Sequence, residues 1–242
     1  DWIADFCASH PDRLAGAGVI SLEDIGLAVQ QLRLVARKGL RTGAITHAPP
    51  EDQPYSHPRY EPFWAAAEEI GIPISLHAVT AARRRRMQSQ EFMVFYPSAV
   101  VDIQYSLSHI IVSGVLERHP RLKLVSVEND IGWVGTYLAR IDHAYERHRH
   151  WTGSGKRLPA RPSEYFRRGV SLTFQFDKPG VETRHHVGVD NIMWASDYPH
   201  SDTTWPRSRE FIQWQFGDLP EVERHKIICG NAAKLYSFEV LG

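Results

Sequence analysis

The sequence predicts an α/β fold built from parallel strands, and two patterns support this. Short apolar runs alternate with longer segments of helical spacing along most of the 242 residues. Polar residues that could carry chemistry come directly after several of these runs, at the carboxyl ends of the predicted strands. Two arrangements fit: a closed (β/α)₈ barrel, in which such ends meet at one mouth where active sites lie, and an open doubly wound sheet, for which no dinucleotide-binding Gly-x-Gly-x-x-Gly follows the first strand.

The apolar pattern predicts six strands, at 14–20, 42–46, 73–77, 122–127, 170–176 and 192–195. Helices are predicted at 23–38, 60–70, from Pro97 to about 119, at 133–150, at 206–215, and at 220–238 with a break at Gly230. Six strands are two fewer than a complete barrel needs. We therefore expect residues 1–242 to form one domain, which as a barrel would be two strands short.

Composition bounds the partners of this domain. The formal net charge is zero, which disfavours a nucleic-acid partner. No apolar run approaches the roughly 20 residues that a membrane-spanning helix needs, and the first residues do not resemble a signal peptide. The two cysteines, Cys7 and Cys229, match no metal or redox spacing. We expect a reduced, cytoplasmic protein.

The run from Arg83 to Arg86 is the one dense basic cluster. Such runs are usually solvated loops. The functional alternative is that Arg83 and its neighbours clamp an anionic group of a substrate.

His77 and Asp197 each end an apolar strand. An imidazole and a carboxylate at such positions suit a divalent metal, either Zn²⁺ or Mn²⁺. A catalytic zinc usually takes three protein ligands, so two are too few. From the residues alone, a hydrogen-bonded core histidine is the favoured interpretation of His77.

Glu128 ends another predicted strand. It could be a general base, a metal ligand, an orienter of His77 or part of a structural salt bridge. His47 and His57 follow a further strand, where substrate contacts are common, although a solvated loop is an equal alternative. Trp133 could wall the pocket or belong to the core.

Four stretches resemble the amidohydrolase-related family, which includes several decarboxylases, hydrolases and hydratases of aromatic compounds. The segment from Ile192 to His200, with Ser196-Asp197-Tyr198-Pro199-His200, is similar to the signature at that family's last barrel strand. The stretches at 10–13, 71–77 and 229–236 resemble its third strand, fifth strand and closing helix. The resemblance covers about residues 9–238.

The resemblance implies a metal site in which His77 and Asp197 are two ligands. The family's other two ligands form a His-x-His on its first strand, and the resemblance places the first two strands upstream of this sequence, so we expect the barrel domain at 1–242 to be incomplete at its N-terminal end. The family's decarboxylases carry a histidine after the sixth strand, where this chain has Glu128.

We therefore expect a metal-dependent enzyme acting on a small carboxylated, aromatic-derived compound. Glu128 would move a proton, Asp197 would act with it, and His47, His57, Arg83, Trp133 and His200 would contact the substrate. Water addition with bond cleavage is the first expectation, and non-oxidative decarboxylation is the second. A catalytically inactive binding protein is the alternative of another class. Family members often form dimers, so a homodimer is a further expectation.

Overall fold

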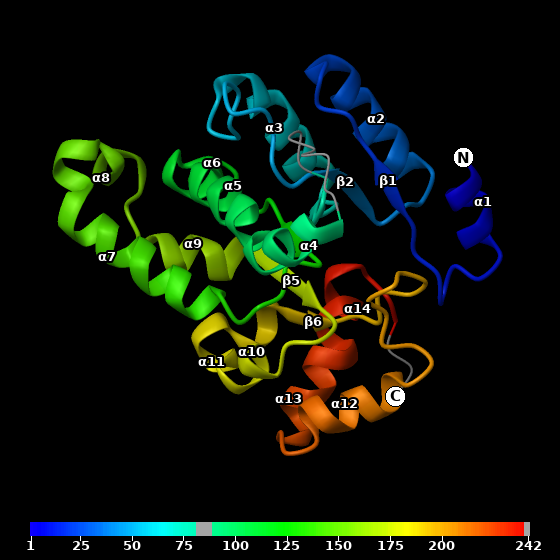
Figure 1. The fold of residues 1–242 in the computed structure, drawn as a ribbon. Helices are drawn as coiled ribbons and strands as arrows, with labels where there is room; N and C mark the ends of the chain where they lie inside the picture. The colour runs from blue at the N-terminus through cyan, green and yellow to red at the C-terminus, as the bar shows by residue number, and fades with distance from the viewer. Residues whose placement is uncertain (81–88, 240–242) are drawn as a thin grey trace.

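The structure, a computed structural model, describes residues 1–80 and 89–239. Its centre is one parallel sheet of six strands, whose spatial order follows the chain from β1 to β6 (Figure 1). The strands are β1 (Ala17–Val19), β2 (Thr42–Thr46), β3 (Ile74–His77), β4 (Leu124–Val127), β5 (Val170–Phe174) and β6 (Ile192–Trp194). Each lies within a range that the sequence predicts, so the expected α/β fold of parallel strands is confirmed.

Helices connect successive strands. Those that the sequence predicts are α2 (Ile25–Arg37), α3 (Glu61–Ile70), α5 (Val100–Val112), α6 (Val115–Arg118), α7 (Val134–Thr152), α12 (Ser208–Phe216), α13 (Glu221–His225) and α14 (Asn231–Leu235). The structure adds α1 (Trp2–Ala8), α4 (Ser89–Phe95), α8 (Ser154–Arg157), α9 (Pro162–Gly169), α10 (Lys178–Glu182) and α11 (Arg184–Val187). The short turns are η1 (Pro58–Tyr60), η2 (Tyr96–Ser98) and η3 (Val189–Asn191).

The expected break at Gly230 takes another form. A π-helical turn, η4 (Lys226–Gly230), connects α13 to α14, and Gly230 keeps ordinary right-handed helical angles. The helix therefore does not stop at the glycine. It widens locally, because hydrogen bonds in a π-helical turn join residues five apart instead of four.

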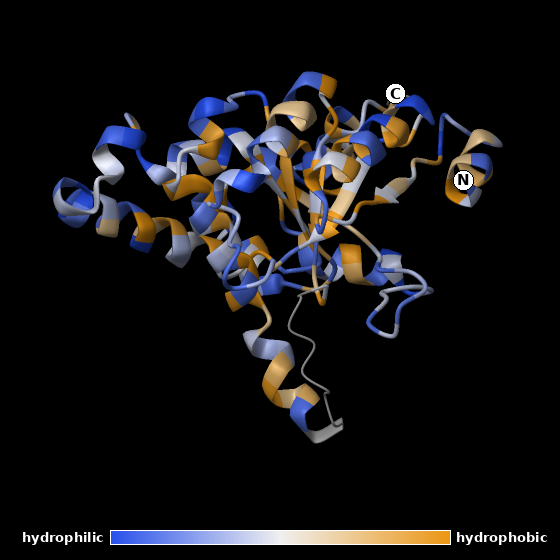
Figure 2. Ribbon diagram, turned by 90° about the horizontal axis from the view of Figure 1, so that it is seen from above, coloured by the Kyte–Doolittle hydropathy of each residue, from blue (hydrophilic) through white to orange (hydrophobic). Residues whose placement is uncertain are grey.

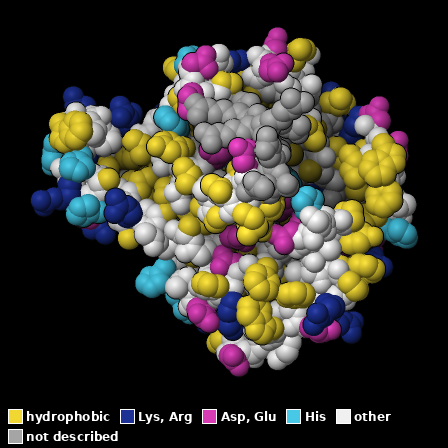
Figure 3. Space-filling view, viewed as in Figure 1, with side chains coloured by type: hydrophobic (Ala, Val, Ile, Leu, Met, Phe, Trp, Pro, Cys, Tyr) yellow, Lys and Arg dark blue, Asp and Glu magenta, His cyan; other side chains and the backbone are white. Residues whose placement is uncertain are grey.

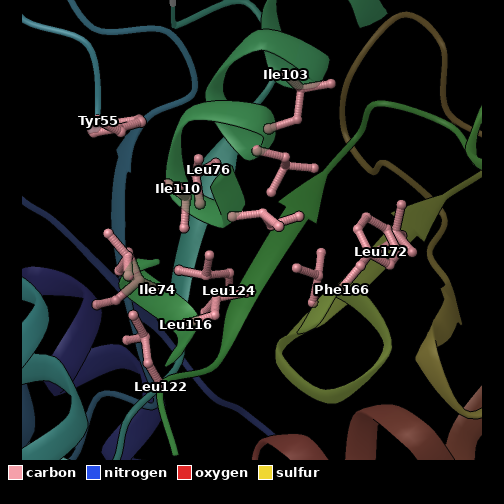
Figure 4. Packing of buried hydrophobic residues seen from close by; sticks show 14 of the residues in the cluster. Tyr55, Ile74, Leu76, Ile103, Ile110, Leu116, Leu122, Leu124, Phe166 and Leu172 are labelled. Atoms are coloured by element: carbon pink, nitrogen blue, oxygen red, sulfur yellow. The ribbon is translucent and has the colours of Figure 1, made fainter. Parts of the chain in front are cut away.

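The hydrophobic core lies between the sheet and its covering helices. Ile74 and Leu124 are register partners on β3 and β4, and both are fully buried. Figure 4 shows these side chains beside Ile110 of α5 and near Phe166 of α9. Since alternate residues of a strand point to opposite faces, this packing leaves Ser75 and His77 on the other face.

That other face is the inner face of a partial barrel. Among the described residues, β1 pairs only with β2 and β6 only with β5, so the sheet does not close. On β1 the outward Gly18 is buried, whereas Val19 on the inner face is 87% exposed. Residues at the inner face of β5 are also partly accessible.

Two helical segments extend from this body. The end of α7 and the short α8 form an arm at the left of Figure 1. In Figure 2, α4 projects from the body with apolar residues along it, and Met93 and Val94 are largely exposed. Within the described part of the chain, no helix is both long and apolar enough to cross a membrane.

Candidate active site at the carboxyl ends of the strands

His77 and Glu128 meet where β3 and β4 end. The register pairs His77 with Val127, so the side chain of the next residue, Glu128, reaches the imidazole. His77 Nε2 lies 3.3 Å from Glu128 Oε1, and His77 Nδ1 lies 2.9 Å from the carbonyl oxygen of Ala78. The hydrogen bond to Glu128 is the largest cause that raises the pKa of His77, and the same contact lowers the pKa of Glu128.

Asp197 joins this pair from the segment after β6. Its side chain is 8% exposed, and it also contacts the Glu128 carboxyl. Burial, followed by the negative charge of Glu128, raises the pKa of Asp197 to about 6. A proton held between the two carboxyls relieves their repulsion. The structure therefore brings together the three residues for which the sequence predicts metal-binding and catalytic roles.

The backbone at both carboxylates is unusual. Glu128 and Asp197 have φ angles of +58° and +56°, in the left-handed region that side chains other than glycine and asparagine seldom adopt. Glu128 is held there by its N–H, which donates to Thr173 Oγ1 on β5 at 3.0 Å. Left-handed residues of this kind cost free energy and concentrate at functional sites.

His200 lies one turn beyond Asp197. Its N–H donates to the Asp197 carbonyl at 2.9 Å, and its Nδ1 lies 3.5 Å from Asp197 Oδ2. The His200 side chain is 70% exposed. It thus stands at the outer rim of the cluster, where an incoming ligand could meet it.

His47 lies beneath the strand ends rather than on an open surface. Its side chain is 2% exposed, and burial lowers its pKa. Thr80 donates from its N–H to His47 Nδ1 at 3.2 Å, while Thr80 Oγ1 donates to the His77 carbonyl at 2.5 Å. His47 Nε2 faces Asp102 of α5 at 3.8 Å. These contacts connect the ends of β2 and β3, so His47 supports the strand that carries His77.

A second set of acidic side chains, Asp130 and Asp202, lies beside the cluster, and the sequence analysis did not identify either of them. Asp202 Oδ2 accepts hydrogen bonds from Gln175 Nε2 at 3.1 Å and from the hydroxyl of Tyr96. Burial, and then the charges of Asp177 and Asp202, raise the pKa of Asp130 to about 7. The positions of Asp130 and Gln175 in the sequence could have indicated a role in the site, because these residues follow the ends of β4 and β5. Figure 3 shows acidic side chains gathered near the centre of this face.

The other predicted substrate contacts are placed differently. Trp133 precedes α7, where its Nε1 donates to the Asn129 carbonyl at 2.7 Å and its ring packs against Tyr137. His57 caps η1 by accepting from the Arg59 N–H, and it lines a groove beside α5. Arg83 lies outside the described residues.

The donor chemistry of the cluster suits a divalent cation. With Nδ1 directed at a backbone carbonyl, His77 can present its Nε2 lone pair to a metal, an arrangement common among metal-binding histidines. The apposed carboxyls of Glu128 and Asp197 would also be relieved by a cation. Within residues 1–80 and 89–239, however, no group of three or more side chains is arranged to hold an ion. These residues therefore offer suitable donors but an incomplete coordination shell.

The partial barrel and the cluster at its strand ends define the chain as a barrel protein whose site is built from imidazole and carboxylate groups. A sequence model of the family described as Amidohydrolase matches residues 1–238. The chain belongs to this family, as its resemblance implied, and its fold is a partial amidohydrolase-type (β/α)₈ barrel.

Relatives within this family include decarboxylases. The chain is 24% identical over 257 residues to the gamma-resorcylate decarboxylase of Rhodococcus jostii, an alignment that covers 99% of this chain and 75% of the relative. The 5-carboxyvanillate decarboxylase LigW of Sphingomonas paucimobilis is similar in structure, with a TM-score of 0.80 and 26% identity over 99% of this chain and 71% of LigW.

A third similar structure is a dihydroxybenzoic acid decarboxylase from Polaromonas, solved with bound manganese and the inhibitor 2-nitroresorcinol. It has a TM-score of 0.73 and 20% identity, and the match covers 100% of this chain and 74% of that one. At this identity the likeness concerns the fold.

Proposed function

We propose that this chain carries part of the active site of a metal-dependent, non-oxidative decarboxylase of hydroxylated aromatic carboxylates. The observation that carries the proposal is the contact of His77, Glu128 and Asp197 at the ends of β3, β4 and β6. The named relatives decarboxylate substrates of this class. They favour decarboxylation over the water addition that the sequence alone put first, so we adopt the second expectation.

His77 and Asp197 would hold the cation, and manganese is favoured over zinc by the Polaromonas structure. When bound, such an ion polarises a substrate oxygen. The remaining coordination positions would be filled by water or by oxygens of the substrate.

In the reaction the bond between the ring and the carboxylate breaks, and the ring carbon takes a proton as carbon dioxide leaves. The protein must therefore deliver one proton to carbon. Glu128 stands between His77 and Asp197 and would pass that proton toward the substrate. Asp130, whose pKa lies near 7, would remain a neutral acid in part of the population near neutral pH and could replenish it.

The test measures manganese content and carbon dioxide release from 2,6-dihydroxybenzoate by the purified chain. We expect bound manganese and turnover in the wild type, and loss of both in His77→Ala. His10→Ala, at an exposed histidine before β1, is the matched control and should retain both. If the chain binds metal and hydrolyses an aromatic ester or amide but releases no carbon dioxide, it is a hydrolase and the decarboxylase proposal is wrong. Absence of metal and of turnover would favour the inactive binding protein.

A further inference from the structure

A second concavity lies away from the strand ends, on the helical side of the sheet. It is a groove of about 890 Å³ between the loop at 55–58 and the C-terminal half of α5, with α6 and α8 at one end. This volume is in the range of small-molecule sites. His77, Glu128 and Asp197 do not line it.

The walls of the groove are mainly apolar. Pro58 and Val112 contribute carbon surface, the buried Tyr55 and Val115 lie behind it, and Tyr105 of α5 lies along it with 66% of its surface exposed. An exposed tyrosine beside an apolar wall offers a face on which a flat ring can pack. The shape and lining therefore suit an occupant with an apolar, preferably aromatic, body.

Two arginines, Arg118 and Arg157, stand at one end of the groove, and within the described structure only Arg118 is neutralised by a carboxylate. Arg118 donates from Nε and Nη2 to the two carboxylate oxygens of Glu61, each at 2.8 Å, and from Nη1 to the Ser113 carbonyl at 2.9 Å. This bidentate pairing occupies both the guanidinium and the carboxylate.

Among the residues that the structure describes, Arg157 of α8 is held only by long bonds to backbone carbonyls. Its Nε donates to Val112 at 3.4 Å and its Nη2 to Thr152 at 3.3 Å. Across the described parts of the chain, no carboxylate lies within ion-pair distance of this guanidinium. The carbonyls at the end of α5 hold it beside the groove but do not cancel its charge.

His109 adds no charge to this balance at neutral pH. His109 Nδ1 is bonded to Ser56 Oγ at 2.9 Å, and burial lowers the pKa of His109. His57 uses its Nδ1 to accept from the Arg59 N–H. Glu61 and Arg118 cancel, so Arg157 gives the groove an uncompensated positive charge at one end of an apolar surface.

We propose that this groove is a second ligand site that binds a small organic monoanion, an aromatic carboxylate, with its carboxylate on Arg157 and its ring along Tyr105 and Val112. Charge complementarity selects the occupant. A dianion would exceed the available charge, and a neutral ring would leave Arg157 unpaired. The proposal does not depend on the function proposed for the strand-end cluster.

The test uses 4-fluorobenzoate and ¹⁹F NMR titration of the whole chain, with 4-fluorobenzyl alcohol as the neutral probe. We expect the acid to bind more tightly than the alcohol. In Arg157→Gln the affinity for the acid should fall about tenfold, the loss expected for one charge-assisted hydrogen bond. Arg147→Gln removes an equal charge from an exposed position on α7 outside the groove and should leave the affinity unchanged.

A second variant tests the apolar wall of the groove. Val112→Trp should fill the groove and abolish binding of both probes, while its circular dichroism spectrum confirms the fold. His77→Ala separates the two sites, because binding in the groove should survive it.

Four results would overturn the proposal, and three of them concern binding of the probes. The first is no binding of the acid, and the second is equal binding of acid and alcohol. The third is loss of binding in His77→Ala with retention in Arg157→Gln, which would place the probe at the strand ends. If sedimentation shows a dimer that Tyr105→Ala dissociates, the groove is instead covered by a second copy of the chain.

Discussion

His77 Nε2 and Glu128 Oε1 lie 3.3 Å apart, across the ends of two neighbouring parallel strands. The contact joins residues that are far apart in sequence and depends on the register that pairs His77 with Val127. It also controls the charge of both groups, because each favours the ionised form of the other.

Glu128→Gln should lower the pKa of His77, since the carboxylate that stabilises the imidazolium is removed. The His77 ring signal, followed by NMR after chelator treatment, measures this directly. Glu61→Gln is the control, because that acid contacts His119 instead. An unchanged His77 pKa in Glu128→Gln would contradict the pairing.

The same pair gives a pH dependence of stability. The raised pKa of His77 stabilises the fold below its ordinary value of 6.5, and this contribution is lost as pH rises through the folded pKa. The lowered pKa of Glu128 stabilises the fold above its ordinary value of 4.5. The destabilisation caused by Glu128→Gln should therefore be largest between these values.

Asp130→Asn should stabilise the protein increasingly as pH rises. The folded-state pKa of about 7 lies above the ordinary 3.8, so the native state retains a proton that the unfolded chain has lost, and wild-type stability falls across this window. The gain should be near zero below pH 3.8 and reach on the order of 2 kcal/mol above pH 7, allowing for residual solvation of the carboxyl. Asparagine also tolerates the left-handed angles at this position.

Denaturant unfolding from pH 5 to 8 measures this difference. Asp218→Asn removes an exposed carboxyl and serves as the matched control. If the free energies of unfolding of wild type and Asp130→Asn change with pH in the same way, the raised pKa of Asp130 is contradicted.

Ser126→Ala should raise the free energy of unfolding by about 1 kcal/mol. Ser126 is fully buried on β4, and its hydroxyl has no hydrogen-bond partner within the described structure. Ser75→Ala is the contrasting change, because Ser75 Oγ and Thr42 Oγ1 bond at 2.9 Å, and it should destabilise. Thermal and denaturant unfolding compare the two, and equal losses would contradict the distinction.

Gly18→Ala should destabilise by about 2 kcal/mol through overpacking. A Cβ at Gly18 would lie 2.2 Å from Val35 Cγ2, so β1 approaches α2 too closely for any side chain. Val35→Ala removes the opposing methyl groups, and the double variant should lose less stability than the two single changes added together. Strict additivity in this cycle would show that the clash is not the cause.

Periodicity and position predicted much of the candidate site. Apolar runs located all six strands, and the rule that parallel strand ends converge placed His77, Glu128 and Asp197 together. The resemblance implied the family, which residues 1–238 match. The sequence put water addition first because Glu128 occupies the position where the family's decarboxylases have a histidine. A single residue type is weak evidence about the reaction, since the nearby Asp130 also has a pKa near neutrality.

Short helices were not predictable in the same way. The helices α8, α10 and α11 contain five residues or fewer, which is too short to display a helical period. Tertiary contacts support such elements, as when Asp177 caps α10 by accepting from the Gly180 N–H.

The sequence by itself determined the strands, their parallel arrangement and the identity of the polar residues at their ends, because these depend on local spacing along the chain. Only the tertiary structure decided what each residue does there. It buried His47, raised the pKa values of Asp130 and Asp197, and placed Arg157 beside an apolar groove with no carboxylate of the described residues in ion-pair distance. Burial and charge are set by neighbours from distant parts of the chain, and no local pattern contains that information.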